Sequence, residues 1–394
     1  MSNSILTSQV RVPFLAEIES NLPVLANGTV QYNKNFVAGN GVTVDVLLPD
    51  SSVDIVDGGD LTSHLSDIKA EATSVTLVQK GFGVSVDAIE NSLKLSSFVD
   101  QVAKPKGRKF ASELQKLAIE KLKLGAATLK VTTTQKYTDI GEPVAAVEAS
   151  RLNGDYFGVM SPKIAKGVLD SGLAFFQADL KNNFVTGNIG RYMGCDFFKT
   201  QDMGGTFSVG AYTATSPAVN QPTAYVAGAT ALAIDASTLS GTIVKYMAFT
   251  VAGVNAVDIH GEDSGLPYVF IAQANVTASG NAASVTILPV YASGPLKNVT
   301  ALPANDAVIT FLHSASKTYQ SVLVWDKQAF VTASAVLKKL SNTVGVATEG
   351  KVMNLLGQQG SDIVKSLDVI RFDCLIGFAL LYRNGVSRLD IEVA

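Results

Sequence analysis

The stretch that decides the fold is KGRKFASELQKLAIEKLKL, which runs from Lys106 to Leu124. Its apolar residues recur at the spacing of one helical face, and opposite charges stand four residues apart on the other side. The apolar face comprises Phe110, Ala111, Leu114, Leu117, Ala118, Leu122 and Leu124, and the charged pairs are Lys109–Glu113 and Lys116–Glu120. A helix over 106–124 would be about 27 Å long. Because strand and turn patterns surround it, we expect a spine helix against which sheets pack.

Composition limits the class of protein. Only 16% of the 394 residues are charged, 47% are hydrophobic, and the mean hydropathy is +0.25. No run of about 18 apolar residues is present, as a membrane-spanning helix needs, and the first residues lack the basic-then-apolar pattern of a signal peptide. We therefore exclude a membrane protein and expect the low charge to reflect extensive contact between copies of the chain.

The charge balance and the cysteines exclude two further classes. A net charge of −3 gives no overall electrostatic attraction to nucleic acid. Cys195 and Cys374 lie far apart in the sequence, so they form neither a disulfide framework nor a zinc-binding spacing. We expect both to be buried thiols in a reducing compartment.

The first segment, residues 1–35, has little periodicity. Pro13, Pro23 and Asn27-Gly28 interrupt its mixture of apolar and polar residues. We predict an extended arm that gains structure by lying on a neighbouring subunit. A compact monomer with its first forty residues buried in its own core would contradict this interpretation.

Residues 36–80 contain two alternating runs, Val42–Val46 and Thr73–Leu77, which predict a long two-stranded hairpin. Such a ribbon is marginally stable alone, so it should lean on a neighbour. Between the runs lies a polar region that contains Asp54, Asp57 and Asp60. Their spacing does not match an EF-hand loop, and we expect no metal site there.

The spine helix belongs to a third segment, residues 81–145. Before it, the pattern predicts short helices over about 86–93 and 96–103. After it, residues from 125 onward are predicted to be a polar linker with a helical tail over 143–152.

The helix itself carries a basic run, with seven Lys or Arg residues and two Glu residues between Lys104 and Lys123. A surface that faces nucleic acid or an acidic partner fits this run, and so does a solvated helix face. We favour the solvated face.

Residues 146–203 predict a fourth segment, with a buried strand over 155–160, a short helix from 164 and a strand pair within 188–198. The stretch GNIGRYMGCDFF in that pair is too irregular for a dinucleotide-binding fingerprint. The chain then changes character at about residue 204.

From 204 to 314 Ala, Thr, Val, Ser and Gly dominate, charges nearly vanish, and short alternating strands recur. The strand candidates are 232–234, 247–251, 269–272, 285–288 and 308–311. This pattern predicts a small antiparallel barrel or sandwich inserted into an α+β chain.

Residues 315–394 return to the pattern of the earlier chain. We expect a strand over 322–325, a mixed segment over 328–340, and a run of strands over 362–393. Trp325 is expected to be a core residue.

Catalytic motifs are missing from the sequence. It contains no phosphate-binding GxxxxGK[ST] loop, no HExxH, no GxSxG elbow and no paired CxxC. His64, His260 and His313 are the only histidines, and they fall in three separate regions. We therefore expect no catalytic, cofactor-binding or metal-binding residues, and a structural protein rather than an enzyme.

Several stretches resemble the major coat proteins of tailed bacteriophages with the Hong Kong 97-type capsid fold. The chain is most similar to the branch of short-tailed Salmonella phages, whose coat protein carries an insertion domain. The stretches that carry the resemblance are Leu323–Phe330, Phe249–Val254, Val285–Pro289 and Phe372–Gly377. Two positions depart from it, because Asp326 stands where the family usually has His, and Tyr382-Arg383-Asn384 replaces the family's Arg-Pro-Glu.

The resemblance implies an N-terminal arm over 1–35 and an extended hairpin, the E-loop, over 36–80. It implies a peripheral domain over 81–145 with the spine helix over 106–124, and an axial domain that begins with 146–203. Residues 204–314 would be the inserted β-barrel domain, and 315–394 the return to the axial and peripheral domains.

The resemblance also implies partners and a location. Hexamers and pentamers of the chain would close an icosahedral shell in the virion, assembled in the bacterial host cytoplasm around double-stranded DNA that is contacted only weakly. We expect a separate scaffolding protein, a portal protein at one vertex, no membrane partner and no crosslink between subunits. A phage tail-tube or other β-rich virion protein is the alternative, and an unrecognised hydrolase is a remote one.

Overall fold

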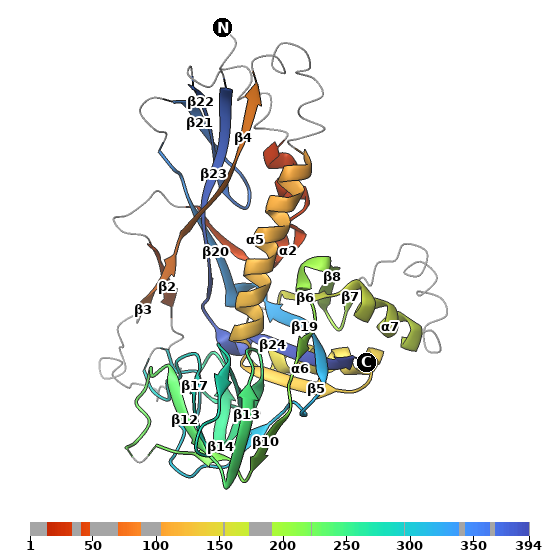
Figure 1. The fold of residues 1–394 in the computed structure, drawn as a ribbon, viewed down its shortest axis with the longest axis vertical. Coiled ribbons are helices and arrows are strands. Elements are labelled where there is room, and N and C mark those ends of the chain that lie inside the picture. The colour runs from red at the N-terminus through yellow and green to blue at the C-terminus, as the bar shows by residue number, and fades with distance from the viewer. Residues whose placement is uncertain are drawn as a thin grey trace, which may run out of the picture. The chain divides into compact units, whose positions relative to one another are not determined.

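The computed structural model describes residues 14–33, 41–47, 70–87, 104–152, 154–172, 191–221, 223–294, 296–338, 343–362 and 367–393. The chain has mixed α+β structure (Figure 1). It divides into two compact units, each built from segments that are distant in the sequence. Unit 1 comprises 1–44, 74–119 and 330–379, and unit 2 comprises 45–73, 120–329 and 380–394.

Unit 1 is built on a six-stranded sheet of order β1-β20-β23-β22-β21, with β4 also paired to β23. Its strands are β1 Val30–Asn33, β4 Val78–Asp87, β20 Phe330–Ala335, β21 Val344–Glu349, β22 Asn354–Asp362 and β23 Leu367–Leu380. The alternation in β23 buries one face, because Ile370, Phe372, Cys374 and Ile376 are all buried. The predicted strand pattern near the C-terminus is confirmed.

Residues 14–33 are not an extended arm, so the conformation predicted for them is wrong. Residues 14–20 are helical, α2 follows at Pro23–Gly28, and β1 pairs in parallel with β20. Phe14, Ile18, Leu22 and Leu25 have helical spacing and are all fully buried. Residues 1–13 lie outside the described part of the chain.

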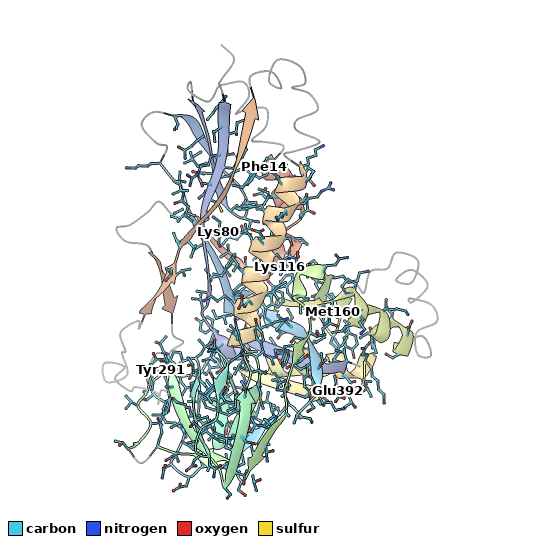
Figure 2. The ribbon with its side chains drawn as sticks, in the orientation of Figure 1. Phe14, Lys80, Lys116, Met160, Tyr291 and Glu392 are labelled. Carbon is cyan, nitrogen blue, oxygen red and sulfur yellow. The ribbon has the colours of Figure 1, made fainter. Side chains whose placement is uncertain are left out.

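An aromatic cluster holds the first of these helices in unit 1. The ring of Phe14, labelled in Figure 2, lies 4.7 Å from that of Phe372 in β23 and 4.9 Å from that of Phe82 in β4. Phe82 also contacts Phe110 of the long helix at 6.1 Å. Tilted aromatic pairs at these separations add to the stability gained from burial. The apolar residues near the amino end of the described chain are therefore satisfied within unit 1.

The predicted spine helix is confirmed as α5, Lys104–Gly125. Its buried stripe includes Phe110, Ala111, Leu114, Ala118 and Leu122 as expected. Leu117 is 38% exposed, contrary to the prediction, because it lies at the edge of that stripe. Two more residues of the helix, Gln115 and Lys123, are buried although the sequence pattern counted them as polar.

Unit 2 contains a seven-stranded sheet of order β5-β24-β19-β6-β8-β7, with β9 also paired to β19. Its strands are β5 Thr128–Thr132, β6 Tyr156–Met160, β7 Arg191–Tyr192, β8 Cys195–Lys199, β9 Phe207–Ser208, β19 Thr318–Asp326 and β24 Val386–Val393. Two helices, α6 (Tyr137–Glu148) and α7 (Pro162–Gly172), pack on it. Ile140 and Val144 of α6 and Val168 of α7 share a core with Val324 of β19 and Leu389 of β24.

Residues 204–314 form the β-rich region, as predicted. Three three-stranded antiparallel sheets, β10-β13-β16, β11-β12-β17 and β15-β14-β18, share one hydrophobic core with β5 and β19. The strands are β10 Tyr212–Thr215, β11 Ala218–Val219, β12 Ala231–Asp235, β13 Thr238–Ile243, β14 Ala248–Val257, β15 Asp263–Ile271, β16 Val276–Thr277, β17 Ala282–Thr286 and β18 Ile309–Phe311. Strand β9 lies near the start of this region in sequence and β19 follows its end, and these two strands pair antiparallel.

Three other local predictions need correction. Val86 and Asp87 end the strand β4 rather than begin a helix, and residues 88–103 lie outside the described part of the chain. The predicted linker after 125 contains β5 and the first half of α6, because that helix begins at Tyr137 rather than at 143 and ends at Glu148. The mixed segment after 328 contains β20. The predicted hairpin strands are present as β2 Gly41–Leu47 and β3 Ala70–Thr76, which pair with each other.

The turn between β7 and β8 supports a stability prediction. Met193 and Gly194 both have positive φ, at 48° and 78°, as a two-residue type I′ turn requires. Asn tolerates this conformation far better than Met, and Met193 is 45% exposed. Met193→Asn should raise the free energy of unfolding of unit 2 by about 0.5–1 kcal/mol in urea titrations. Met193→Ala keeps the unfavourable φ, so an equal gain from Ala would contradict this explanation.

Candidate functional site at the carboxyl end of α5

The last carbonyl groups of α5 are each bound by a side chain from elsewhere in unit 2. Arg388 Nη1 donates to Lys123 O at 3.0 Å, and Gln273 Nε2 donates to Leu124 O at 3.1 Å. Arg383 Nε donates to Gly125 O at 3.3 Å. A helix leaves these carbonyls without partners inside the helix, and cationic side chains there also complement the helix dipole. The end of α5 is therefore a junction of β24, the β-rich region and the turn that precedes β24.

Arg388 of β24 is the centre of this junction, and its side chain is fully buried. Its Nε lies 3.0 Å from both carboxylate oxygens of Asp390, and Nη2 also donates to Asp390. Nη2 donates to Tyr246 O at 2.6 Å as well, and the guanidinium lies over the Phe207 ring. A buried cation needs such a set of acceptors to offset its lost hydration.

Asp390 receives two further hydrogen bonds. Ser321 Oγ donates to one carboxylate oxygen and His313 Nε2 to the other, each at 2.7 Å. Burial by itself would raise the pKa of Asp390, but Arg388 and the hydrogen bond from His313 outweigh it and hold that pKa well below its usual value. Asp390 is therefore ionised and fully bonded.

Serine, histidine and aspartate meet here, but not as a nucleophile with its base. Ala248 N–H donates to His313 Nδ1 at 3.1 Å, so the proton of the neutral ring is on Nε2, which faces Asp390. Ser321 donates to Asp390 rather than to the histidine, and all three side chains are buried. A triad needs the base to accept the proton of the serine, which this arrangement does not provide.

Tyr246 holds an uncommon backbone conformation at the junction. Its φ is 75°, which is rare for an aromatic residue and costs about 1–3 kcal/mol. The residue lies between β13 and β14, and its carbonyl oxygen accepts the hydrogen bond from Arg388. The strained turn thus places an acceptor of the β-rich region against β24.

Several basic residues of the run in α5 have partners within the chain. Arg108 pairs with Glu17 at 2.6 Å, Lys106 lies over the Phe82 ring, and Lys123 donates to Met203 O. The acidic residue Glu120 pairs with Lys245 of the β-rich region. Five basic residues of the run are exposed, namely Lys106, Arg108, Lys109, Lys116 and Lys121, so a solvated face fits them. The interpretation is wrong for Lys123, which is buried.

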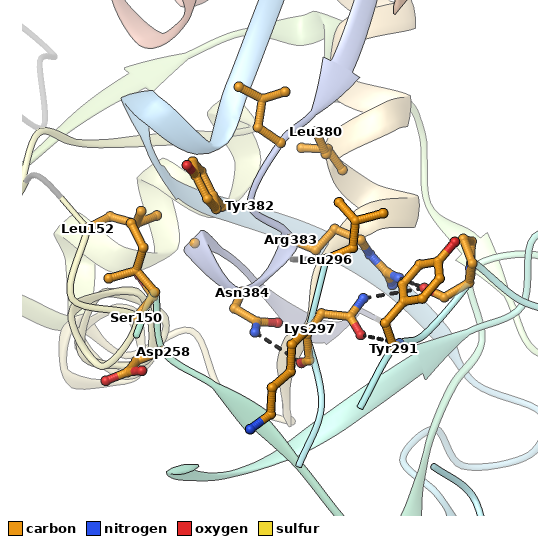
Figure 3. Close-up of a pocket in the computed structure, with 15 residues that line it drawn as sticks. Ser150, Leu152, Asp258, Tyr291, Leu296, Lys297, Leu380, Tyr382, Arg383 and Asn384 are labelled. Atoms are coloured by element: carbon orange, nitrogen blue, oxygen red, sulfur yellow. Dashed lines mark hydrogen bonds between the residues drawn. The ribbon is translucent and has the colours of Figure 1, made fainter. Parts of the chain in front are cut away.

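A cavity of about 250 Å³ lies beside the junction, within unit 2 (Figure 3). The turn η5, Arg383–Gly385, forms one wall. Arg383 Nη1 donates to Pro289 O at 3.0 Å, while Asn384 Nδ2 donates to Val257 O at 2.6 Å and to Asn298 O at 3.0 Å. The residues that departed from the family pattern therefore bind this turn to the β-rich region.

Asp326, the other departure, has a structural role. It is fully buried and accepts hydrogen bonds from Gly154 N–H at 2.9 Å and Gln328 N–H at 2.8 Å. Burial raises its pKa above the usual value. The carboxylate caps the turn η4, Lys327–Ala329, which follows β19.

The remaining residues considered in the sequence are the two cysteines, His260, His64 and three aspartates, and those that the structure describes are not arranged as a catalytic or metal-binding site. Cys195 and Cys374 are buried free thiols, as expected, and burial raises the pKa of Cys374 to about 12. His260 is exposed, far in sequence from His313, and His64 lies outside the described residues, as do Asp54, Asp57 and Asp60. Among the residues that the structure describes, no group of three His, Cys, Asp or Glu could hold a metal ion.

Comparison with known proteins rests on the fold. No family model matches the sequence, and no curated protein sequence matches it. The chain is similar to the capsid protein of Ralstonia phage GP4, with a TM-score of 0.51 and 10% identity over 93% of this chain and 87% of that one. It is also similar to a protein in the head structure of Helicobacter pylori bacteriophage KHP40, with a TM-score of 0.50 and 9% identity over 95% of this chain and 91% of that one.

The chain has the fold of phage capsid proteins. At this level of identity the likeness concerns the fold alone. The capsid fold is matched over almost the whole length of the chain. Within the described residues, no helix is long and apolar enough to cross a membrane.

Proposed function

We propose that this chain is the major capsid protein of a tailed bacteriophage. The observation that carries the proposal is the likeness to two phage capsid and head proteins over 93% and 95% of the chain. Copies of the chain would form hexamers and pentamers that close an icosahedral shell around double-stranded DNA. The role is structural, and the virion is its location.

The finer assignments follow from the resemblance in sequence. They are the Hong Kong 97-type elements, assembly in the host cytoplasm with a separate scaffolding protein, a portal protein at one vertex, and weak contact with the packaged DNA. One argument for the shell no longer holds. The apolar side chains of residues 14–33 are buried within unit 1, so they do not need a neighbouring subunit to cover them. The proposal therefore depends on the fold and not on an unsatisfied arm.

We infer further that residues 204–314 are an inserted domain of the kind found in the coat proteins of short-tailed Salmonella phages. The pairing of β9 with β19 supports this, because Ser208 and Thr318 lie opposite each other where the chain goes in and out. Inserted domains characteristically have neighbouring ends. The shared core of the three sheets also supports it.

Negative-stain electron microscopy tests the shell function. Coexpression of the chain with the scaffolding protein of its phage should yield closed particles, and the same preparation from a chain with Asp390→Ala should not, because that change disrupts unit 2. Tubes would point to a tail protein and would overturn the proposal. Small soluble oligomers at high concentration, with the scaffold present, would overturn it as well.

A further inference from the structure

Lys123 stands apart from the other charged residues of the junction. Its side chain is buried, and its ammonium donates to one neutral acceptor, Met203 O. Among the residues that the structure describes, no carboxylate lies within ion-pair distance of it. Buried lysines are nearly always paired, because a cation without a counter-charge loses its hydration with little return.

The acceptor lies on the segment that leads from the central sheet into the β-rich region. Met203 ends the short turn η3, Gln201–Met203, which follows β8 and precedes β9. Gly204 comes next with φ of 72°, and an added Cβ there would lie 3.5 Å from Lys123 Nζ. Lys123 thus forms a hydrogen bond between the last turn of α5 and this segment.

The charged groups near Lys123 come from α5 itself, the β13–β14 connection and β24. Glu120 lies on α5 itself but pairs with Lys245 from the β13–β14 connection, beside Tyr246. Arg388 and Asp390 of β24 are paired with each other, and neutral His313 bonds to Asp390. Burial and the nearby guanidinium of Arg388 lower the pKa of Lys123 to about 8, although Asp390 and Glu120 oppose the shift.

We propose that Lys123 is a proton-operated joint between α5 and the segment 201–205. The joint is closed when Lys123 contacts Met203 O and open when that contact is broken. With the ammonium charged, the closed state contains a buried cation without a counter-charge, which favours opening. Loss of the proton removes that penalty and the repulsion from Arg388, while the remaining N–H groups still donate to Met203 O. This inference concerns the single chain and does not rest on the proposed shell function.

The sign of the pH dependence follows from proton linkage. An opened or unfolded chain holds the Lys123 proton up to about pH 10.4, whereas the closed joint releases it from about pH 8. Between these values the open state binds one more proton, so the closed state gains stability as pH rises. By itself this exchange lowers the unfolding constant by up to about tenfold per pH unit over that range. The buried thiol of Cys195, also in unit 2, opposes it, because burial raises the pKa of that thiol while the thiol of the unfolded chain ionises above about pH 8.5. The effect of Lys123 is therefore the difference from a variant that lacks its ammonium.

Urea unfolding of the full chain between pH 7 and 10, followed by fluorescence, measures this effect. Trp325, the only tryptophan, is buried in unit 2 and reports on its unfolding. The unfolding constant is compared at each pH with that of Lys123→Met, so that titration of the buried thiols cancels. The ratio of the wild-type constant to the Lys123→Met constant should fall as pH rises, and the ratio for Lys121→Met, an exposed position on the same helix, should fall in the same way. The ratio for Lys123→Arg, which keeps its charge, should not fall. The same pH slope in Lys123→Met as in the wild type would overturn the proposal.

A second measurement does not depend on how well the variants fold. In the wild-type chain with lysine labelled at Cε, one buried lysine resonance should titrate near pH 8 by NMR. Titration of every lysine resonance above pH 10 would refute the joint. A resonance that titrates near pH 8 in Lys123→Met as well would show that another group gives the signal and would refute the joint.

Discussion

Replacing Asp390 with alanine is expected to lower the free energy of unfolding of unit 2 by about 3–5 kcal/mol. The change removes the carboxylate that accepts from Arg388, His313 and Ser321. Arg388 would remain fully buried without a counter-ion, which costs far more than the loss of an exposed ion pair. Urea unfolding followed by Trp325 fluorescence measures the loss.

A double replacement separates two contributions to the free energy of unfolding: the cost of leaving Arg388 buried without a counter-ion, and the net contribution of the Arg388–Asp390 ion pair. Arg388→Met with Asp390→Leu removes both the buried guanidinium and the buried carboxylate, so it should recover a large part of the stability lost in Asp390→Ala. It should not recover all of it, because Lys123 O and Tyr246 O lose their donor. A double variant less stable than the single one would show that the capping contacts dominate.

The same pair predicts an acid limit for unit 2. The pKa of Asp390 is held well below its unfolded value of about 3.9. A depressed carboxyl pKa contributes stability that is fully present above the unfolded value and is lost as pH falls below it. Stability of the wild type should therefore decline from about pH 4 downward, more steeply than in the double variant. Identical acid profiles would contradict this prediction.

Replacing Phe14 with alanine should destabilise unit 1 by about 3–5 kcal/mol. Phe14 is fully buried between Phe82 and Phe372, and truncation would leave a cavity that the sheet cannot readily close. Hydrogen–deuterium exchange read by mass spectrometry should show faster exchange in peptides from β4 and β23. Peptides from the β-rich region should be unchanged.

Leu117→Ala is the matched control, because Leu117 is also apolar and belongs to unit 1 but is 38% exposed. It should cost less than about 1 kcal/mol. If Phe14→Ala cost no more than this control, residues 14–28 would not belong to the core of unit 1. The extended-arm interpretation would then apply to them after all.

Periodicity predicted the parts of the fold in which one face is buried. The stripe of α5 and the alternation in β23 are local signals, and the structure contains both elements. The helix at residues 14–20 was missed although Phe14, Ile18 and Leu22 have helical spacing, because Pro13 and Pro23 suggested an irregular segment. Pro23 in fact starts α2, where proline is well tolerated.

Strand β4 was missed for a different reason. Gly81 and Gly83 gave the segment the look of a turn, whereas in the structure both face β23. A side chain at Gly81 would collide with the Phe372 carbonyl, 2.6 Å from the position of an added Cβ. Such a close approach depends on the tertiary packing of two strands that are distant in sequence, so no local sequence pattern reveals it.

The junction could not be predicted for the same reason. Its donors and acceptors come from β24, β19 and the end of α5: the bond from Arg388 to Lys123 O joins residues 265 apart in sequence, and the bond from Ser321 to Asp390 joins residues 69 apart. One signal was present, because Arg388 and Asp390 stand two apart in a strand and so share a face, while Leu389 and Ile391 lie on the other. In a chain with few charges, opposite charges on one face of a buried strand indicate a buried ion pair.

The side-by-side pairing of β9 and β19 has an evolutionary consequence. Ser208 and Thr318 are opposite neighbours in an antiparallel ladder, so a two-residue turn could join them directly. Everything between them can lengthen, shrink or be exchanged by recombination while β19 and β24 keep their register. Such an exchange must replace the carbonyl of Tyr246 that accepts from Arg388, the imidazole of His313 that bonds to Asp390, and the amide of Gln273 that binds the last turn of α5.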